Sequence, residues 1–227
     1  MTIIKNLYKK IIVSSQAMPD EPFYDETSMI AMMKSVVNGG AGALRVAGVR
    51  DVRNAKKLFD IPVIGITKPD KLPDNWKEVV YITPTIEDVR KLAEAGADVI
   101  AFDGTSRQRP NCTLKDIINE IKSLNKLAMA DISTLEEGLN CAELGVDIIS
   151  TTLSGYTKES ETDSLSPDFE LLKQLVEKTD IPVILEGRIW EKADVEKAFK
   201  LNAHSVVIGS AITRPQLIVK RFLEGIV

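Results

Sequence analysis

The stretch that decides the fold runs from Ile181 to Pro215 and reads IPVILEGRIWEKADVEKAFKLNAHSVVIGSAITRP. Its first apolar run, 182–185, is short and β-branched, which is typical of a strand buried on both faces. Residues 190–201 have the apolar spacing of a helix. A second apolar run, 206–208, leads directly into another helical pattern. The stretch therefore predicts two successive parallel strands joined by a crossover helix.

Each of the two strands opens through a glycine toward a helix. Gly187-Arg188 follows the first strand and Gly209-Ser210 follows the second. Backbone N–H groups at such turns, next to positive helix ends, suit a phosphate. In a (β/α)8 barrel the loops after strands 7 and 8 form a site of this kind. We therefore expect a phosphate-binding barrel, with Glu186 beside the phosphate as a candidate for the chemistry.

Length and composition limit the class of protein. The 227 residues, 44% apolar and 27% charged, suit one α/β domain, residues 1–227, without a linker. A net charge of −4 and an aromatic content of 5% favour no nucleic acid, and no apolar run could cross a membrane. The N-terminus lacks a signal-peptide pattern, and Cys112 and Cys141 are expected to be free thiols. We expect a cytoplasmic protein.

The chain has one histidine, His204. A histidine-rich metal site is excluded, and we predict no metal ligands. His204 precedes the last strand, at the end of the barrel opposite to the usual active site, so we interpret it as structural. Acid–base chemistry is then left to Lys, Asp, Glu and Tyr side chains.

A helix end, a small residue and a strand recur along the chain, which indicates repeated βα units. The repeats are GGAGALRV (39–46), AGADVIAFD (95–103), LGVDIIST (144–151) and LNAHSVVIG (201–209). Gly96, Gly145 and Asn202 are predicted as left-handed ends of helices.

Eight strands are predicted, at Ile11–Ser15, Ala43–Val46, Val63–Ile66, Val99–Phe102, Leu127–Ala130, Ile148–Thr151, Val183–Leu185 and Val206–Ile208. A ninth candidate, Val80–Thr83, follows too few residues for a crossover helix, and we interpret it as part of a long loop over the active face.

Eight helices are predicted at 26–38, 50–59, 86–95, 113–124, 133–143, 167–178, 190–201 and 214–225, after a leading helical segment, Met1–Lys10. The predicted N-caps are Asp25, Thr85 (with Asp88 in capping-box position), Thr113 and Ser133, and Pro167 is predicted in the first turn of its helix.

Polar residues just past buried strands point into the active site of such a barrel. In chain order they are Gln16, Arg45, Lys68, Asp103, Asp131, Thr152, Glu186 and Ser210. Lys68 could simply extend into solvent, but its place at the start of the long loop favours a function. Glu186 is costly beside an apolar strand unless it is paired or used.

Lys68 and Glu186 could form a structural ion pair or exchange protons with a substrate. Asp131 could bind hydroxyl groups or orient Lys68. Arg45 and Arg214 suit an anion or a carbonyl, because their guanidinium groups present forked donors.

Two loops add further candidates. The loop 102–110 brings Asp103 and Arg107 together, and it could equally be a solvated basic loop. The loop 151–157, TTLSGYT, supplies Thr152 and Tyr156 for sugar hydroxyls or a phosphate oxygen. Glycosidase chemistry with Asp131 and Glu186 is less natural beside a lysine and a phosphate site.

The chain resembles the N-acetylmannosamine-6-phosphate 2-epimerase family over essentially its whole length. The motifs that carry the resemblance are VSSQAMPDEP (13–22), GALRVAGVRDVR (42–53), PVIGITK (62–68), YITPT (81–85), FDGTSRQRP (102–110), MADIST (129–134), TTLSGYT (151–157), EGRI (186–189) and VIGSAITRP (207–215). No motif is decisive alone, but their combination is specific.

The resemblance implies a (β/α)8 barrel that inverts C2 of a phosphorylated N-acetyl amino sugar, N-acetyl-D-mannosamine 6-phosphate, in sialic acid catabolism. The resemblance also implies that the protein uses no cofactor and no metal. It implies that the protein is a homodimer. The residues it implies are Lys68 and Glu186 as the acid–base pair, Gln16, Arg45, Asp131 and Arg214 for the sugar and acetamido group, and Gly187, Arg188, Gly209 and Ser210 for the phosphate. Whether one group or two move the proton is open.

Three positions depart from the family pattern: Ser15, Val46-Ala47 and Gly104. The second could alter how the acetamido group is held, because it adjoins Arg45. Two other functions are kept open. Lys68 could form a Schiff base in an isomerase or aldolase, or the barrel could bind a phosphosugar without turnover.

Overall fold

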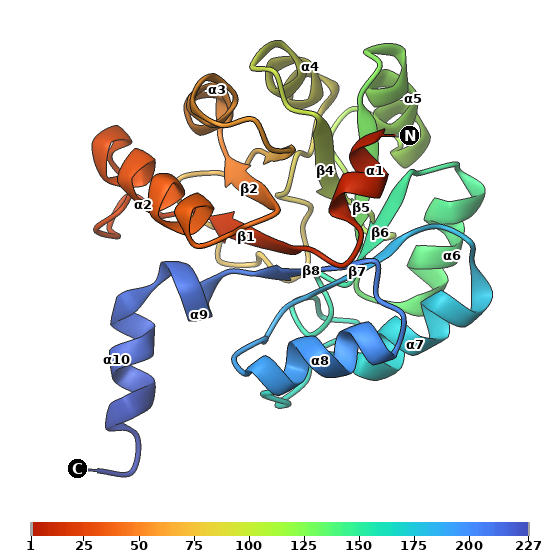
Figure 1. Ribbon diagram of the computed structural model, residues 1–227. Helices are drawn as coiled ribbons and strands as arrows, with labels where there is room; N and C mark the ends of the chain where they lie inside the picture. The colour runs from red at the N-terminus through yellow and green to blue at the C-terminus, as the bar shows by residue number, and fades with distance from the viewer. Residues whose placement is uncertain (1, 227) are drawn as a thin grey trace.

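A computed structural model describes residues 2–226 and contains a closed barrel of eight parallel strands (Figure 1). The strands are β1 (Ile11–Ser15), β2 (Ala43–Ala47), β3 (Val63–Ile66), β4 (Val99–Asp103), β5 (Leu127–Asp131), β6 (Ile148–Ser150), β7 (Val183–Glu186) and β8 (Ser205–Ile208). They pair in chain order, and β8 closes the ring on β1 with Val207 opposite Ile12. The predicted (β/α)8 fold is confirmed.

Helices surround the barrel and follow the strands. They are α1 (Thr2–Leu7), α2 (Glu26–Asn38), α3 (Val49–Leu58), α4 (Ile86–Glu94), α5 (Leu114–Ser123), α6 (Leu135–Glu143), α7 (Phe169–Lys178), α8 (Lys192–Lys200), α9 (Ser210–Thr213) and α10 (Pro215–Leu223). Apolar residues of these helices and the outward-facing strand residues form the larger core.

Side-chain hydrogen bonds at the helix starts confirm the N-caps Asp25, Thr85 and Thr113. The Ser133 cap is wrong by one residue, because Thr134 accepts from the Glu137 N–H and Ser133 instead donates to the Glu137 carboxylate.

Two other helix starts differ from the prediction. Pro167 lies outside α7, which is capped by Asp168. The helix predicted at 214–225 corresponds to α10, which begins at Pro215, and the non-helical backbone of Arg214 separates it from the short helix α9.

The predicted left-handed helix ends are confirmed. The φ angles are +98° at Gly96, +85° at Gly145 and +64° at Asn202. Each turns the chain from a helix into the following strand, where a side chain other than glycine or asparagine is rarely accommodated.

Alternation along the strands sends every second side chain into the barrel. The inner cluster includes Ile12, Ala43, Ile64, Ile66, Val99, Ala101, Met129, Ile148, Ile184 and Val207. Continuing the same alternation toward the carboxyl ends brings Gln16, Arg45, Lys68, Asp131, Thr152 and Glu186 to the inner face. The apolar floor therefore positions a ring of polar side chains directly above it.

The end of the barrel away from these side chains is covered by α1. Leu7 is fully buried, and the His204 ring nitrogen Nε2 lies 2.8 Å from the carbonyl oxygen of Ile4. His204 thus joins α1 to the start of β8, as expected for a structural residue. The helix ends at Leu7, three residues earlier than the predicted leading segment.

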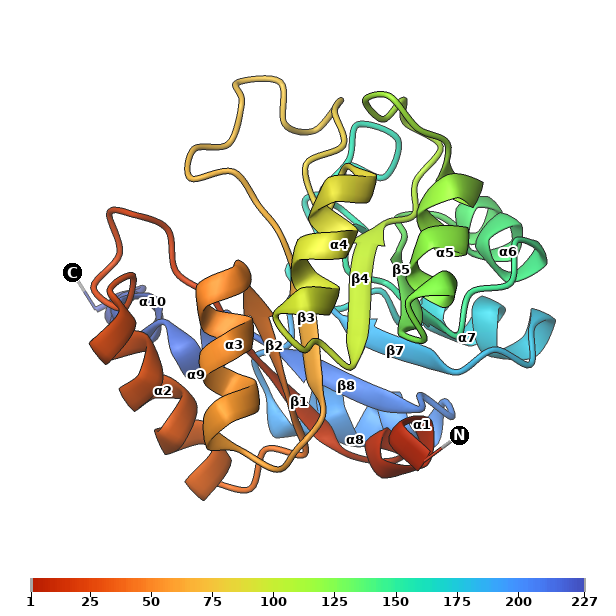
Figure 2. The same cartoon turned by 90° about the horizontal axis from the view of Figure 1, so that it is seen from above.

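The segment 67–85 rises beyond the carboxyl ends of the strands, opposite to α1 (Figure 2). It contains no strand: Val80–Thr83 is a loop, as predicted, although the Ile82 carbonyl accepts from the Asp103 N–H. Its outer part meets the loop after β6 through the ion pairs Lys77–Glu161 and Lys158–Glu78.

The last helix, α10, projects away from the barrel (Figure 1). None of its residues is buried, and Val219, Phe222 and Leu223 are exposed by 58%, 75% and 51%. In the part of the chain that the structure describes, no helix combines the length and apolar character needed to cross a membrane.

Candidate active site

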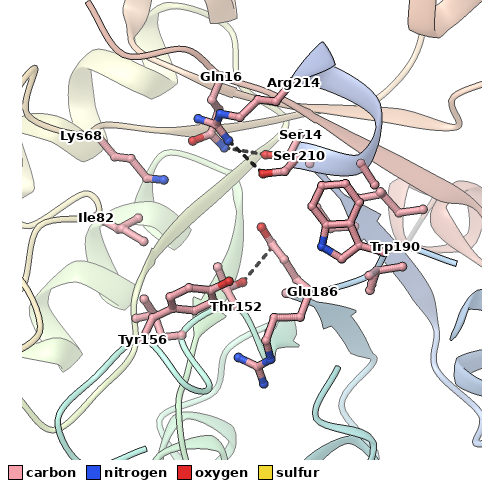
Figure 3. A pocket seen from close by; sticks show the side chains of 18 of the residues that line it. Ser14, Gln16, Lys68, Ile82, Thr152, Tyr156, Glu186, Trp190, Ser210 and Arg214 are labelled. Atoms are coloured by element: carbon pink, nitrogen blue, oxygen red, sulfur yellow. Dashed lines mark hydrogen bonds between the residues drawn. The ribbon is translucent and has the colours of Figure 1, made fainter. Parts of the chain in front are cut away.

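A cavity of about 400 Å³ opens at the carboxyl ends of the strands (Figure 3). Its lining includes Ser14, Gln16, Lys68, Tyr81, Thr152, Tyr156, Glu186, Gly187, Arg188, Trp190, Gly209, Ser210 and Arg214. Most of the residues predicted from the strand ends and the two glycine turns therefore meet in one place, although they are spread over 200 residues of sequence.

Lys68 and Glu186 reach this cavity from opposite sides. Lys68 follows β3 and Glu186 ends β7, four strands further along the ring of eight. The Lys68 residue as a whole is exposed at the rim, but its amine points into the cavity, among the side chains that line it (Figure 3). A substrate between them would have the amine on one face and the carboxyl on the other.

The surroundings move the pKa values of both groups toward neutrality. Loss of water around the amine, followed by repulsion from Arg45, lowers the pKa of Lys68 to about 8. Burial raises the pKa of the Glu186 carboxyl, although attraction to Arg45 opposes this shift. Groups with such values can accept and donate protons near neutral pH.

Below the cavity, Arg45 and Asp131 form a buried pair. The guanidinium donates to Asp131 Oδ2 at 2.6 Å and to Oδ1 at 3.1 Å, and the two side chains are 1% and 0% exposed. Arg45 Nε lies 3.5 Å from Glu186 Oε1 and has no hydrogen bond. Within this pair, it is the Arg45 guanidinium that places a positive charge beside the carboxyl group of Glu186.

Arg214 lies at the cavity wall but is already held by a carboxylate. It donates to Glu21 through Nε at 2.6 Å and through Nη2 at 3.0 Å. Gln16 donates to Ser14 Oγ at 2.8 Å. Sequence reasoning missed Glu21 as a partner, although it belongs to the PDEP motif at the end of the loop after β1.

The two glycine turns lie side by side, as β7 pairs with β8. Gly187 has a φ of +105° and Arg188 a φ of +57°, so the chain turns sharply after Glu186. The Arg188 guanidinium donates to the carbonyl oxygens of Ser154 and Ser166 at 2.5 and 2.8 Å. A phosphate at this turn would therefore meet backbone N–H groups rather than a free Arg188 side chain.

The structure brings Asp103 and Arg107 together but places neither in the cavity lining. Arg107 Nη2 donates to Asp103 Oδ2 at 2.6 Å, and Nη1 donates to the carbonyl oxygens of Trp76 and Lys77 at 3.3 and 3.1 Å. These contacts support the long loop from below. They give Arg107 a structural role that the sequence pattern did not reveal.

Two aromatic lining residues were not among the predicted site residues. Burial, followed by the charge of Asp103, raises the pKa of Tyr81 to about 12, which keeps the phenol a hydrogen-bond donor. Trp190 lies opposite Lys68 across the cavity (Figure 3). Tyr81 stands in the YITPT motif, so a signal was present in the sequence.

The positions that depart from the family pattern have different surroundings. Ser15 and Val46 face the helices and are fully buried, whereas Ala47 points inward beside the cavity. Within residues 2–226, no group of three or more His, Cys, Asp and Glu side chains is placed to hold a metal ion.

The fold and the cavity define a (β/α)8-barrel protein with an amine and a carboxyl group facing each other across the mouth. The model of the NanE family, described as "Putative N-acetylmannosamine-6-phosphate epimerase", matches residues 29–227. The chain belongs to this family.

Named relatives and a solved structure agree with this assignment. The chain is 47% identical over 216 residues to "Putative N-acetylmannosamine-6-phosphate 2-epimerase" of Clostridium perfringens (strain 13 / Type A), which covers 94% of this chain and 95% of that one. It is 45% identical over 219 residues to the protein of the same name from Clostridioides difficile (strain 630), covering 96% of each chain. The structure of the N-acetylmannosamine-6-phosphate 2-epimerase from Clostridium perfringens superposes with a TM-score of 0.91 at 45% identity, covering 97% of this chain and 95% of that chain.

Proposed function

We propose that this protein interconverts N-acetyl-D-mannosamine 6-phosphate and N-acetyl-D-glucosamine 6-phosphate, as an isomerase of sialic acid and N-acetylmannosamine catabolism in the cytoplasm. Membership of the epimerase family supports the reaction. The observation in the structure that carries it is the pairing of Lys68 and Glu186 across one cavity, with pKa values moved toward each other.

Inversion at C2 requires the loss and return of one proton next to the C1 aldehyde of the open-chain sugar. One group breaks the C2–H bond, the electron pair moves to the C1 oxygen, and a proton returns on the other face. A neutral Lys68 amine and a protonated Glu186 carboxyl are suited to these two steps. The positive charge of Arg45 favours the enolate that forms between them.

The remaining cavity residues would hold the substrate. Gly187, Arg188, Gly209 and Ser210 would surround the phosphate with backbone N–H groups, and Gln16, Thr152, Tyr156 and Arg214 would contact the sugar and the acetamido group. Arg45 and Asp131 lie deeper and would act mainly on Glu186 and on the reacting carbon. A phosphate bound away from C2 supplies binding energy that holds C2 in place.

Proton NMR in D2O tests the proposed reaction. Wild-type protein given N-acetylmannosamine 6-phosphate should form the gluco epimer with deuterium at C2. Lys68→Ala and Glu186→Ala should each lower the rate by about 10²-fold or more, since each removes a proton-transfer group. Lys57→Ala and Glu177→Ala, which change exposed residues of the outer helices, are the matched controls. No epimer with wild-type protein that binds the phosphosugar would refute the proposal.

A Schiff-base reaction at Lys68 is the second candidate, because a lowered amine pKa also favours imine formation. Borohydride reduction in the presence of the phosphosugar distinguishes the two. A covalent adduct on Lys68 indicates the Schiff base, and its absence during turnover indicates proton transfer.

We also infer that the protein is a homodimer. The support is α10, which leaves its own barrel and exposes the apolar side chains of Val219, Phe222 and Leu223. Exposed apolar patches of this kind are typical of interfaces. A second copy of the chain is the proposed occupant, since α10 projects away from its own barrel and its apolar side chains are not covered by that barrel (Figure 1).

A further inference from the structure

The hydroxyl group of Thr152 lies within hydrogen-bond distance of three oxygens. Its Oγ1 is 2.7 Å from Asp131 Oδ1, 2.9 Å from Glu186 Oε2 and 2.9 Å from Ser150 Oγ. Thr152 stands just after β6, so its side chain lies between the end of β5 and the end of β7. It is therefore the group that connects the two carboxyl groups of the site.

A threonine hydroxyl has one proton to donate and two lone pairs to accept with. It cannot donate to two carboxylates at once. If Asp131 and Glu186 were both ionised, one carboxylate oxygen would face a lone pair of Thr152 at less than 3 Å with no proton between them. All three contacts are satisfied when Thr152 donates once and accepts twice. Of the two hydrogen bonds that Thr152 then accepts, one comes from a protonated carboxyl group, Asp131 or Glu186, and the other comes from the Ser150 hydroxyl.

The surroundings of the two carboxyl groups decide which of them carries the proton. Both oxygens of Asp131 accept a hydrogen bond from the positive Arg45 guanidinium, the bidentate arrangement of an arginine–carboxylate pair. Glu186 receives no hydrogen bond from Arg45: Nε lies 3.5 Å from Oε1. Burial also raises the pKa of Glu186. The proton therefore belongs on Glu186, and Thr152 points its own proton at Asp131.

We propose that Thr152 is a positioning residue that keeps Glu186 in its acid form, by accepting a hydrogen bond from the Glu186 O–H while donating a hydrogen bond to the Asp131 carboxylate. Its role in turnover rests on the proposed function, in which Glu186 supplies a proton to C2. In that step the Glu186 O–H bond breaks and a C2–H bond forms. Lys68 is left protonated and Glu186 ionised, and proton exchange with water restores both.

Other charged and titratable groups face this chain of hydrogen bonds and affect its titration. They are Arg45 from β2, Lys68 after β3, Asp131 at the end of β5, Tyr81 and Tyr156 from the two loops, Arg188 after β7 and Arg214 before α10. The variants below leave all of them in place.

If the Thr152 hydroxyl pointed the other way, toward Glu186, the predicted change in the pKa of Glu186 would have the opposite sign. If Thr152 donated to Glu186, its removal would raise the pKa of Glu186, because a donor stabilises the ionised form. If Thr152 accepts from Glu186, its removal lowers that pKa. The sign of the change therefore distinguishes the two orientations.

Infrared difference spectroscopy of the free protein measures this sign directly, without relying on turnover. The carboxylic acid band lost in Glu186→Gln identifies protonated Glu186, and its pH midpoint is then compared among variants. In Thr152→Val, which has nearly the same shape and no hydroxyl, the midpoint should fall by about one pH unit, or about tenfold in acidity. Thr152→Ser should keep the wild-type midpoint.

Ser150→Ala is the matched control, because it removes a hydroxyl at the same 2.9 Å from Thr152 and leaves the chain from Glu186 to Asp131 intact. Its midpoint should stay close to the wild-type value. A midpoint that rises or does not move in Thr152→Val, or no Glu186 acid band in the wild type, overturns the proposal. Circular dichroism of each variant verifies that the barrel is folded.

Kinetic measurements test the role of Thr152 in turnover separately from the infrared test of its hydrogen bond. If the protein is an epimerase, Thr152→Val should lower kcat by about tenfold with a smaller change in KM, and Thr152→Ser should recover most of the rate. A protein without epimerase activity could still show the predicted infrared shift, in which case the reaction is wrong and the hydrogen-bond chain is right.

Discussion

The chemistry of Lys68 depends on its surroundings, because they lower the pKa of its amine. With a pKa of about 8, about half of its amine is neutral at pH 8, whereas a lysine with the ordinary pKa of about 10.4 is about 0.4% neutral. Only the neutral amine can take a proton from carbon. Lys68 should therefore react with an amine-directed reagent at pH 8 about a hundredfold faster than an ordinary lysine.

Mass spectrometry of the labelled peptides gives this comparison. Labelling of Lys68 should increase as the pH rises through about 8, and phosphosugar should protect it. Labelling at the same rate as the lysines on the outer helices would contradict the lowered pKa. The expected pH dependence of catalysis has the same sign, because protonation below about pH 8 removes the base. The apparent pKa values obtained from a plot of rate against pH would describe Lys68 and Glu186 together, because the two groups interact.

For single residues, the sequence predicted which side chains lie near the mouth of the barrel better than it predicted their hydrogen-bond partners. Arg45, Lys68, Asp131, Thr152 and Glu186 could be predicted because strand alternation determines which side chains face the mouth. Asp103 obeys the same rule, but it pairs with Arg107 of the following loop instead of facing the cavity. The pairing of polar groups cannot be predicted from the strand ends, because pairing depends on distances between side chains across the barrel.

At the scale of the element, the helix starts carry their own stabilisation. Thr85 accepts from the Asp88 N–H, and Asp88 in turn accepts from the Thr85 N–H and hydroxyl. Thr85→Ala should lower the free energy of unfolding by about 1 kcal/mol, since the Asp88 N–H at the start of α4 loses its acceptor. Denaturant unfolding measures this loss, and Thr85→Ser should retain most of the stability. Equal stability of the alanine variant would show that the cap contributes nothing.

Strands were the elements that sequence predicted well, and the ends of helices were not. A buried parallel strand is a short apolar run with few alternatives, so all eight strands lie where they were expected. The errors at Ser133, predicted as a cap, and Pro167, predicted in a first turn, arose because the next residue, Thr134 or Asp168, has a side chain able to cap and takes that position. The helix predicted at 214–225 was nearly right, because Pro215 fits the first turn of α10, whereas the four residues of α9 are too few to give a helical period.

At the scale of the whole molecule, α10 determines the expected assembly. Sedimentation should show a species of about twice the 25.0 kDa chain mass. Phe222→Asp places a charge in the exposed apolar face of α10 and should shift the protein toward the monomer, because burying an unpaired carboxylate is costly. Lys220→Ala, on the same helix, should leave the assembly unchanged. A wild-type protein that sediments as a monomer would refute the homodimer.

The ties between the two loops at the mouth have a consequence for how substrate enters. The loops 67–85 and 151–166 meet through Lys158–Glu78, Lys77–Glu161 and the hydrogen bond from the Lys158 N–H to the Lys77 carbonyl. Exposed ion pairs contribute about 0–1 kcal/mol each in water. Parting the loops therefore costs little free energy compared with unfolding any strand beneath them. We therefore expect the two loops to part more readily than the strands that align Lys68 and Glu186, and added salt should make that parting easier.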